Sequence, residues 1–237
     1  MVRFAAEQLE VETARVAVLA ADSTPATLLE AVREAVVELG WQELPFEPYS
    51  VPTFDAETLE ERLRESGAEV VVSLAVDREL RSFLEAAAAS GWTPYVLAPG
   101  ALAGDLVVAA PAPFDERLVC AYPTLPNDRT PWGVGELSRL LADVEGGESH
   151  VQAMISAYSA AAVLTEAMRR AGRNLGRREL TAALEGFYQF ETGLTPPITY
   201  TNNRRIGANG AYVVAYQSEP PEDRGELLRS APWIEVE

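Results

Sequence analysis

The chain has 237 residues, of which 48% are hydrophobic, so it can bury a substantial core in one large domain or two small ones. Its formal net charge is −17. Nucleic acids and anionic membranes bind to basic faces, so this charge argues against both as partners. All nineteen basic residues are arginine, which removes every mechanism that needs a Schiff-base or phosphate-loop lysine.

Cysteine and histidine each occur once, as Cys120 and His150. Zinc sites built on these residues, internal disulfides and Cys–His nucleophile pairs therefore have no support, and we expect no cofactor and no metal. Cys120 stands in the apolar run LVCAY and is predicted to be a buried, unreactive thiol. The sequence has neither a Gly-x-Ser-x-Gly elbow nor a glycine-rich nucleotide fingerprint, so an enzyme is the least supported class.

The most continuous aliphatic run is EVVVSLAV, over residues 69–76. A run of this kind is typical of a strand whose two faces are both covered by helices, which places it at the centre of a parallel sheet.

Strand–loop–helix units surround this run. Residues 15–20 predict the first strand, and Thr24 followed by Pro25 is typical of a helix N-cap and first helical position. Apolar residues then follow at helical spacing up to Gly40. Residues 44–49 contain two prolines and predict a strand at the sheet edge.

Two more units follow. Asp55 is expected to cap a helix in which Leu59 and Leu63 face inward, whereas the charge run Glu60, Glu61, Arg62 and Arg64 is interpreted as its solvent face. Asp77 is expected to cap the next helix, whose apolar stripe is Leu80, Phe83, Leu84, Ala87 and Ala88 and which stops at Gly91. Residues 94–98 predict the fourth strand.

The units recur about every 25 residues, which is typical of right-handed crossovers in a parallel, doubly wound α/β sheet. Ligands bind such sheets at the carboxyl ends of the strands. Here that edge consists of residues 21–24, 76–77 and 98–100.

The proline-rich stretch 123–131 is the best internal boundary. Beyond it we predict a helix over 132–144, a capping box at Ser149 and Gln152, a long helix ending at Gly172, and a short helix over 177–184. Strands are then expected at 198–201 and 211–217, with Trp233 and Ile234 as a late anchor. The proposed division is an α/β lobe over 1–124, a helical segment over 125–187, and closing strands and tail over 188–237.

Several polar residues have a structural and a functional interpretation. The hydroxyls of Ser23 and Thr24 could bind a ligand, but capping of the next helix is the preferred interpretation. Pro99 and Gly100 are expected to form a turn, and Tyr122 and Tyr158 to pack in a core or hinge. His150 is expected to be an exposed first-turn residue, and Arg204–Arg205 a solvated hairpin tip.

Three stretches in the later part of the chain carry a family resemblance: FETGLTPPITYTNNRRIGANGAYVVAY, SAYSAAAVLTEAMRRAGRN and RRELTAALEG. Together with the βα units from Arg15 to Tyr122, including GWTPYVLAPGALAG, they resemble the type 1 periplasmic binding proteins, in the Leu/Ile/Val receptor branch of ABC importers. The resemblance covers the second lobe and the later part of the first lobe. The opening half of the first lobe has no counterpart.

The resemblance implies a non-catalytic receptor domain for amino acids or related small organic acids, located in the periplasm or otherwise outside the cytoplasm, with an ABC permease as partner. No signal peptide is recognised at Met1, and we expect the chain to have been cut so that it begins inside a domain. The resemblance and the sheet edge together give six candidate ligand-binding residues: Ser23, Thr24, Ala75, Pro99, Gly100 and Tyr122.

This sequence departs from the family pattern at the predicted edge. The loop Asp22-Ser23-Thr24-Pro25 has no covering tyrosine, Leu74-Ala75-Val76 is aliphatic, and Pro99-Gly100-Ala101 has no acid to pair with an ammonium group. These departures favour a less polar or acidic organic ligand, or none. A ligand-free interaction or sensory module is therefore the alternative function, and an α/β enzyme the third.

The helix Val151–Ala171 should expose an apolar stripe, since the family packs it against a sheet with no counterpart here. We expect this stripe to be covered by a second copy in a homodimer, by rearranged local elements, or by a segment outside these residues.

Overall fold

The computed structural model describes residues 2, 5–6, 13–45, 48–104, 106–142, 151–219 and 233–235. The chain divides into two compact units. Unit 1 comprises Met1–Tyr122 and Val213–Leu227, and unit 2 comprises Pro123–Tyr212 and Leu228–Glu237. Most of the predicted opening helix, the capping residue Ser149 and His150 lie outside the described residues.

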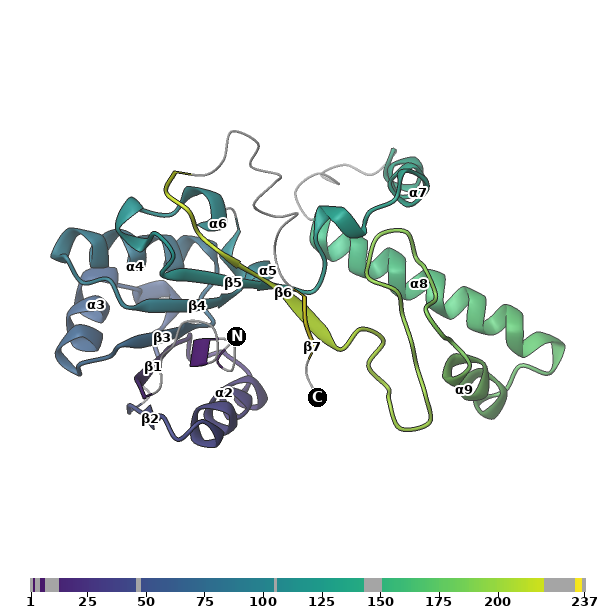
Figure 1. The fold of residues 1–237 in the computed structure, drawn as a ribbon, viewed down its shortest axis with the longest axis horizontal. Helices are drawn as coiled ribbons and strands as arrows, with labels where there is room; N and C mark the ends of the chain where they lie inside the picture. Colours follow the sequence, from purple (N-terminus) through teal and green to yellow (C-terminus); the bar gives the residue numbers. More distant parts are fainter. Residues whose placement is uncertain are drawn as a thin grey trace. The chain divides into compact units, whose positions relative to one another are not determined.

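Unit 1 is built on a twisted sheet with the strand order β2-β1-β3-β4-β5 (Figure 1). All the pairings between these strands are parallel. The four residues of β3 are fully buried between β1 and β4, which confirms the predicted central strand. The bounds of the strands are β1 Arg15–Leu19, β2 Gln42–Glu43, β3 Val70–Ser73, β4 Tyr95–Pro99 and β5 Leu118–Tyr122.

The end of β6 (Gly210–Ala215) completes this sheet beside β5. The N–H of Tyr216 donates to the carbonyl of Leu118 at 2.8 Å, and the N–H of Glu116 donates to the carbonyl of Tyr216 at 2.8 Å. A segment distant in sequence therefore closes the edge of unit 1.

Helices cover both faces of this sheet. The strand order changes direction at β1, and right-handed crossovers then place α2 on one face and α3 and α4 on the other, as Figure 1 shows. Leu80, Phe83 and Leu84 of α4 are fully buried, and Gly91 ends this helix in the left-handed conformation, as the sequence predicts. The bounds are α2 Ala26–Glu38, α3 Ala56–Glu65, α4 Asp77–Ser90, α5 Gly100–Ala103 and α6 Leu106–Ala109, with 3-10 turns at Val51–Thr53 and Ala112–Phe114.

Unit 2 is mainly helical in its described part. Its helices are α7 Pro131–Leu141, α8 Val151–Ala171 and α9 Arg177–Glu185, with 3-10 turns at Pro126–Asp128 and Gly172–Asn174. The start of β6 pairs antiparallel with β7 (Trp233–Glu235), where Tyr212 meets the ring of Trp233 edge-on. The predicted strand over 198–201 is only two isolated bridges, Phe190 to Ile198 and Thr201 to Arg204.

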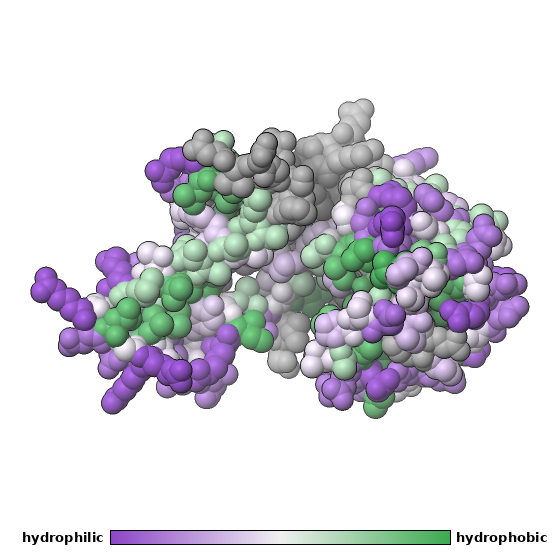
Figure 2. All heavy atoms as spheres, turned by 180° about the vertical axis from the view of Figure 1, so that it is seen from behind, coloured by the Kyte–Doolittle hydropathy of each residue, from purple (hydrophilic) through white to green (hydrophobic). Residues whose placement is uncertain are grey.

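One face of α8 packs against a small core. The core comprises Val163, Ala167, Phe187 and Ile198, with partly buried residues of α9 and of the following segment around it. Other residues of α8 remain exposed, and Figure 2 shows apolar residues in a green band along this part of unit 2. Among the side chains of α8 that the structure describes, the exposed apolar ones are Ala153, Ala157, Ala160, Ala161, Leu164 and Met168.

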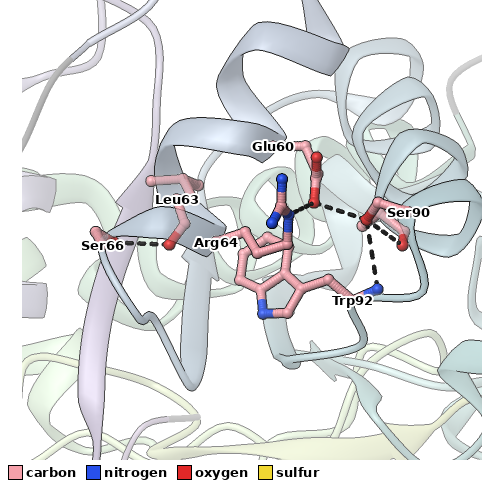
Figure 3. Close-up of polar contacts among 7 residues, drawn as sticks. Glu60, Leu63, Arg64, Ser66, Ser90 and Trp92 are labelled. Atoms are coloured by element: carbon pink, nitrogen blue, oxygen red, sulfur yellow. Dashed lines mark hydrogen bonds and ion pairs between the residues drawn. The ribbon is translucent and has the colours of Figure 1, made fainter.

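The prediction that Glu60 belongs to a solvent face is wrong. Its side chain is 6% exposed, and its Oε1 accepts hydrogen bonds from Ser90 Oγ at 2.7 Å and Arg64 Nε at 3.0 Å (Figure 3). Ser90 ends α4, so the buried carboxylate links α3 to α4. The predicted cap of α3 is confirmed, because Asp55 Oδ1 accepts from the N–H groups of Glu57 and Thr58.

Two boundary predictions also need correction. The second strand lies at Gln42–Glu43 rather than at 44–49, although it does lie at the sheet edge. Asp77 is the first residue of α4 and not its cap, and its carboxylate instead accepts from Arg81 Nη2 at 3.2 Å.

Candidate functional site

The carboxyl ends of β1 and β3 meet at the point where the strand order of unit 1 reverses, which is where open α/β sheets place ligands. Leu74 N–H donates to the carbonyl of Leu19 at 2.8 Å, so the two strand ends are joined directly. The loops over 20–25 and 74–76 leave the sheet together at this point.

The loop after β1 is held by backbone hydrogen bonds. Asp22 N–H donates to the carbonyl of Tyr49 at 2.8 Å, and Thr24 N–H donates to the carbonyl of Ala21 at 3.0 Å. This loop leaves Ser23 exposed and Thr24 partly exposed. Both side chains are therefore accessible from solvent.

The capping role preferred for Ser23 and Thr24 is wrong. Helix α2 begins at Ala26 with Pro25 at the N-cap, and no side chain caps it. The first N–H groups of a helix have no partner within the helix itself. The loop and the first turn of α2 thus present two hydroxyls and the N–H groups of Ala26 and Thr27, and no acidic residue stands in that first turn.

The loop after β3 has a different character. Ser73 is fully buried, and its Oγ accepts from Ala75 N–H at 3.3 Å, which fixes the turn. Ala75 is also fully buried, so it offers no surface to a ligand. Val76 is 52% exposed and Leu74 is partly exposed, so Val76 is the most accessible apolar side chain of this loop.

Gly100 and Tyr122 are brought together after β4 and β5. A Cβ atom at position 100 would collide with the ring of Tyr122, so glycine is required for this close approach. The Tyr122 hydroxyl is buried without a hydrogen-bond partner among the described residues, and burial with the neighbouring Cys120 raises the pKa of Tyr122. Pro99 is paired in register with Ala121 and is partly exposed. Gly100 and Tyr122 therefore pack against each other.

Cys120 lies fully buried beneath this edge, as predicted. Burial raises the pKa of its thiol to about 12, so the reactive thiolate is scarce at neutral pH.

Sequence reasoning missed Glu79 and the tyrosine beside it, Tyr49, which lie near the same loops. Glu79 is 2% exposed; its Oε1 accepts from Arg78 Nη2 at 2.9 Å, and its Oε2 has no hydrogen-bond partner among the described residues. Burial, and secondarily the charge of Glu79, raises the pKa of Tyr49 to about 12. Helical periodicity could have found Glu79, because it stands four residues before the buried Phe83.

The described residues contain no cluster of three or more His, Cys, Asp and Glu side chains that could hold a metal ion. Among the same residues, no helix has the length and apolar character needed to cross a membrane.

A sequence profile described as periplasmic binding protein matches residues 1–221, and the chain therefore belongs to the periplasmic binding protein family. The mostly parallel α/β architecture matches the type 1 members of that family. No curated protein matches the sequence.

Several solved structures share the fold. A branched-chain amino acid ABC transporter protein from Thermus thermophilus with bound valine is 21% identical, with a TM-score of 0.67 over 94% of this chain and 59% of that one. A leucine binding protein from Thermotoga maritima is 16% identical, with a TM-score of 0.65 over 99% and 63%. An ABC transporter solute binding protein from R. palustris in complex with 4-hydroxybenzoate is 15% identical, with a TM-score of 0.65 over 100% and 63%. The present chain thus spans about 60% of the length of these proteins.

Proposed function

We propose that this chain is the solute-binding part of an ABC-type importer, located outside the cytoplasm, and that it binds the carboxylate of an amino acid or small organic acid without catalysis. The observation that carries the proposal is the uncapped start of α2. There, the hydroxyls of Ser23 and Thr24 and the N–H groups of Ala26 and Thr27 are available at the switch point of the sheet.

These groups suit a carboxylate. Hydroxyl and backbone N–H donors bind anionic oxygens, and the positive end of the helix dipole adds to the attraction. The neighbouring Val76 is exposed and apolar, which suits an aliphatic or aromatic body on the same ligand. Solved relatives in complex with valine and with 4-hydroxybenzoate bind molecules of this general form.

The test is calorimetric titration of the chain with valine, leucine and 4-hydroxybenzoate, and with valinamide, which lacks the carboxylate. The double variant Ser23→Ala/Thr24→Ala should lose about 10-fold or more in affinity for the acids, because each lost hydrogen bond contributes about 0.5–1.5 kcal/mol. Valinamide should bind poorly to both proteins.

Thr13→Ala is the matched control, because Thr13 precedes β1 and lies at the opposite edge of the sheet. Equal affinities in the double variant and the original chain would reject this loop as the site. A chain that binds none of the acids at millimolar concentration would reject the receptor function in favour of a ligand-free interaction module.

A further inference from the structure

Unit 1 has a second pocket, which lies at the amino ends of its strands, at the opposite edge of the sheet from the candidate site. Its volume is about 330 Å³, within the range of small-molecule sites, about 300–1,000 Å³. We call it the amino-edge pocket. Its polar and aromatic lining residues are Thr13, Glu69, Trp92, Thr93, Tyr95 and Arg117.

The amino-edge pocket is formed by unit 1 alone. Its residues stand at or just before the starts of β1, β3, β4 and β5, which pair side by side in the parallel sheet. All of them belong to unit 1, whose sheet carries helices on both faces. The strands therefore hold the lining residues in place without any contribution from unit 2.

Arg117 is held in a defined orientation at this pocket. Its Nη1 donates to the carbonyl of Thr93 at 3.1 Å, and its guanidinium lies over the ring of Tyr95, 5.1 Å from the ring centroid. Among the described residues, its Nη2 has no hydrogen-bond partner. A guanidinium that is already ordered donates to a ligand oxygen at a small cost in conformational entropy.

Glu69 supplies an acceptor at the same pocket. Its Oε2 accepts from the N–H of Arg15 at 2.9 Å, and its Oε1 has no partner in the described part of the chain. The hydroxyls of Thr13 and Thr93 also make no hydrogen bond to another described residue. The pocket thus presents hydrogen-bond donors and acceptors together.

Two aromatic side chains give the pocket its apolar surface. Trp92 and Tyr95 are both partly buried, and Trp92 meets the ring of Phe83 edge-on at 6.1 Å. The N–H of Trp92 donates to Ser90 Oγ at 3.4 Å, which holds the turn before β4 (Figure 3). A flat apolar ring of this kind packs against another flat apolar face, such as the C–H face of a sugar.

The charges of the pocket favour a neutral ligand with hydroxyl groups. Glu69 and Arg117 flank β4, since Tyr95 N–H donates to the carbonyl of Glu69 at 3.0 Å and Val96 N–H to that of Arg117 at 2.8 Å. With about 4.8 Å between neighbouring strands, their backbones are about 10 Å apart. An α-amino acid carries its opposite charges on one carbon and is poorly matched to this spacing, whereas a sugar ring has hydroxyls on all sides. The net charge of −17 opposes an anion.

We propose that the amino-edge pocket binds a single sugar unit, either free or at the end of a glycan chain. Arg117 donates to its oxygens, Glu69 accepts from its hydroxyls, and Trp92 packs against its C–H face. This site is separate from the candidate site at the carboxyl edge and does not depend on the proposed function.

Saturation-transfer difference NMR of the 237-residue chain tests the proposal. The probes are the methyl glycosides of glucose, mannose and N-acetylglucosamine as single units, and maltotriose and tri-N-acetylchitotriose as chain ends. At least one of them should bind with millimolar affinity. Equal affinity for the glycoside and its trisaccharide supports a free sugar as the ligand, and tighter binding of the trisaccharide supports a glycan end. Glycylglycine is the zwitterionic probe.

Two substitutions at the pocket should weaken sugar binding. Arg117→Met keeps an unbranched side chain beside Tyr95 but removes the guanidinium, and it should lower the affinity at least about 10-fold. Glu69→Gln keeps an acceptor for the N–H of Arg15 but removes the charge, and it should lower the affinity several-fold. Melting temperatures check that each variant folds. Thr93→Val, which preserves side-chain shape, is the further variant if Arg117→Met does not fold.

Two controls separate this site from other surfaces. Arg33→Met removes an exposed arginine of α2 that pairs with Glu43 outside the pocket, and it should leave sugar binding unchanged. The double variant Ser23→Ala/Thr24→Ala, which should weaken acid binding at the carboxyl edge, should also bind sugar as the original chain does.

Three results would overturn the proposal. The first is that no glycoside or trisaccharide binds at the highest soluble concentration. The second is that glycylglycine binds and the sugars do not, which would assign the pocket to a zwitterion. The third is sugar binding that neither Arg117→Met nor Glu69→Gln weakens, which would place the sugar elsewhere on the chain.

Discussion

The two units of this chain differ in how fully they bury their own apolar residues. Unit 1 has a parallel sheet with helices on both faces, and it contains nine of the twelve largest fully buried side chains among the described residues. Unit 2 contributes Ile155, Phe187 and Leu194 to that set, while eight of its described large apolar residues, including Leu140, Leu164 and Ile206, stay exposed. Unit 1 thus buries its large apolar residues between its own layers, whereas the described part of unit 2 leaves more of them exposed.

Truncating one buried aromatic ring in each unit is expected to have the largest effect and tests whether the two units differ in stability as proposed. Phe83→Ala in α4 should destabilise unit 1 by about 4 kcal/mol, because its fully buried site cannot collapse around the cavity. Phe187→Ala should cost unit 2 about 3 kcal/mol or less, because its small cluster can relax into the open groove that Val163 and Ile198 line. Urea denaturation followed by hydrogen exchange in peptides from each unit measures both. If either variant lowered the free energy of unfolding equally in both units, the chain would unfold as one cooperative body.

Two glycines of α7 provide a sharper test within unit 2. A Cβ atom on Gly133 would lie 2.6 Å from the carbonyl carbon of Gly193, whereas a Cβ on Gly135 would have no neighbour within 4 Å. Gly133→Ala should therefore destabilise unit 2 by about 1–3 kcal/mol. Gly135→Ala should stabilise it by about 0.5–1 kcal/mol through helix propensity. Thermal melts measure the pair, and similar effects of the two variants would contradict the close packing of α7 against residue 193.

The hydrogen bond between Ser90 and the buried Glu60 carboxylate links α3 to α4, and its contribution to the stability of unit 1 can be measured. Ser90→Ala removes the 2.7 Å hydrogen bond from Ser90 Oγ and should cost about 1–2 kcal/mol, because a buried acceptor loses a donor. Ser82→Ala on the same helix is the control for helix propensity. If the two variants melt at the same temperature, the link between α3 and α4 contributes nothing.

The smallest expected effect is a pH dependence in unit 2. Hydrogen bonds from Arg169 and Arg170 lower the pKa of Glu166 to about 2. A carboxyl group whose pKa is lowered by folding stabilises the fold above its ordinary pKa of about 4.3, and this stabilisation is lost as the pH falls toward about 2. Glu166→Gln should flatten the dependence of α8 helicity on pH in this window, as circular dichroism can measure. Glu191→Gln, at an exposed carboxylate of unit 2, serves as the control, and an unchanged pH profile in the Glu166 variant would refute the assignment.

Local patterns predicted most of unit 1. The aliphatic run of β3 and the apolar stripe of α4 are determined by neighbours within a few residues, and both predictions are confirmed. The burial of Glu60 could not be predicted in the same way, because its partner Ser90 is 30 residues away. Similarly, the apolar segment around Ile198 was predicted as a strand, but its extended pairing needs a neighbouring strand that the described part of unit 2 does not supply.

The sequence indicated where in the fold the candidate site would lie, but not which of its groups would be free of structural partners. The spacing of the βα units located the carboxyl edge, and the resemblance named its residues. Whether Thr24 would cap α2 depended on where the helix begins, and a shift of one residue to Ala26 decided against it. Helix boundaries are the least predictable feature of a sequence.

The pairing of β5 with the end of β6 has a consequence for synthesis on the ribosome. Leu118 meets Tyr216, which emerges about 100 residues later, so at about 5–20 residues per second the edge of β5 stays unpaired for about 5–20 s. During that interval most of the intervening unit 2 is being translated. An exposed strand edge is a template for pairing with other strands, so the edge of β5 is open to pairing with other chains until residue 216 has emerged.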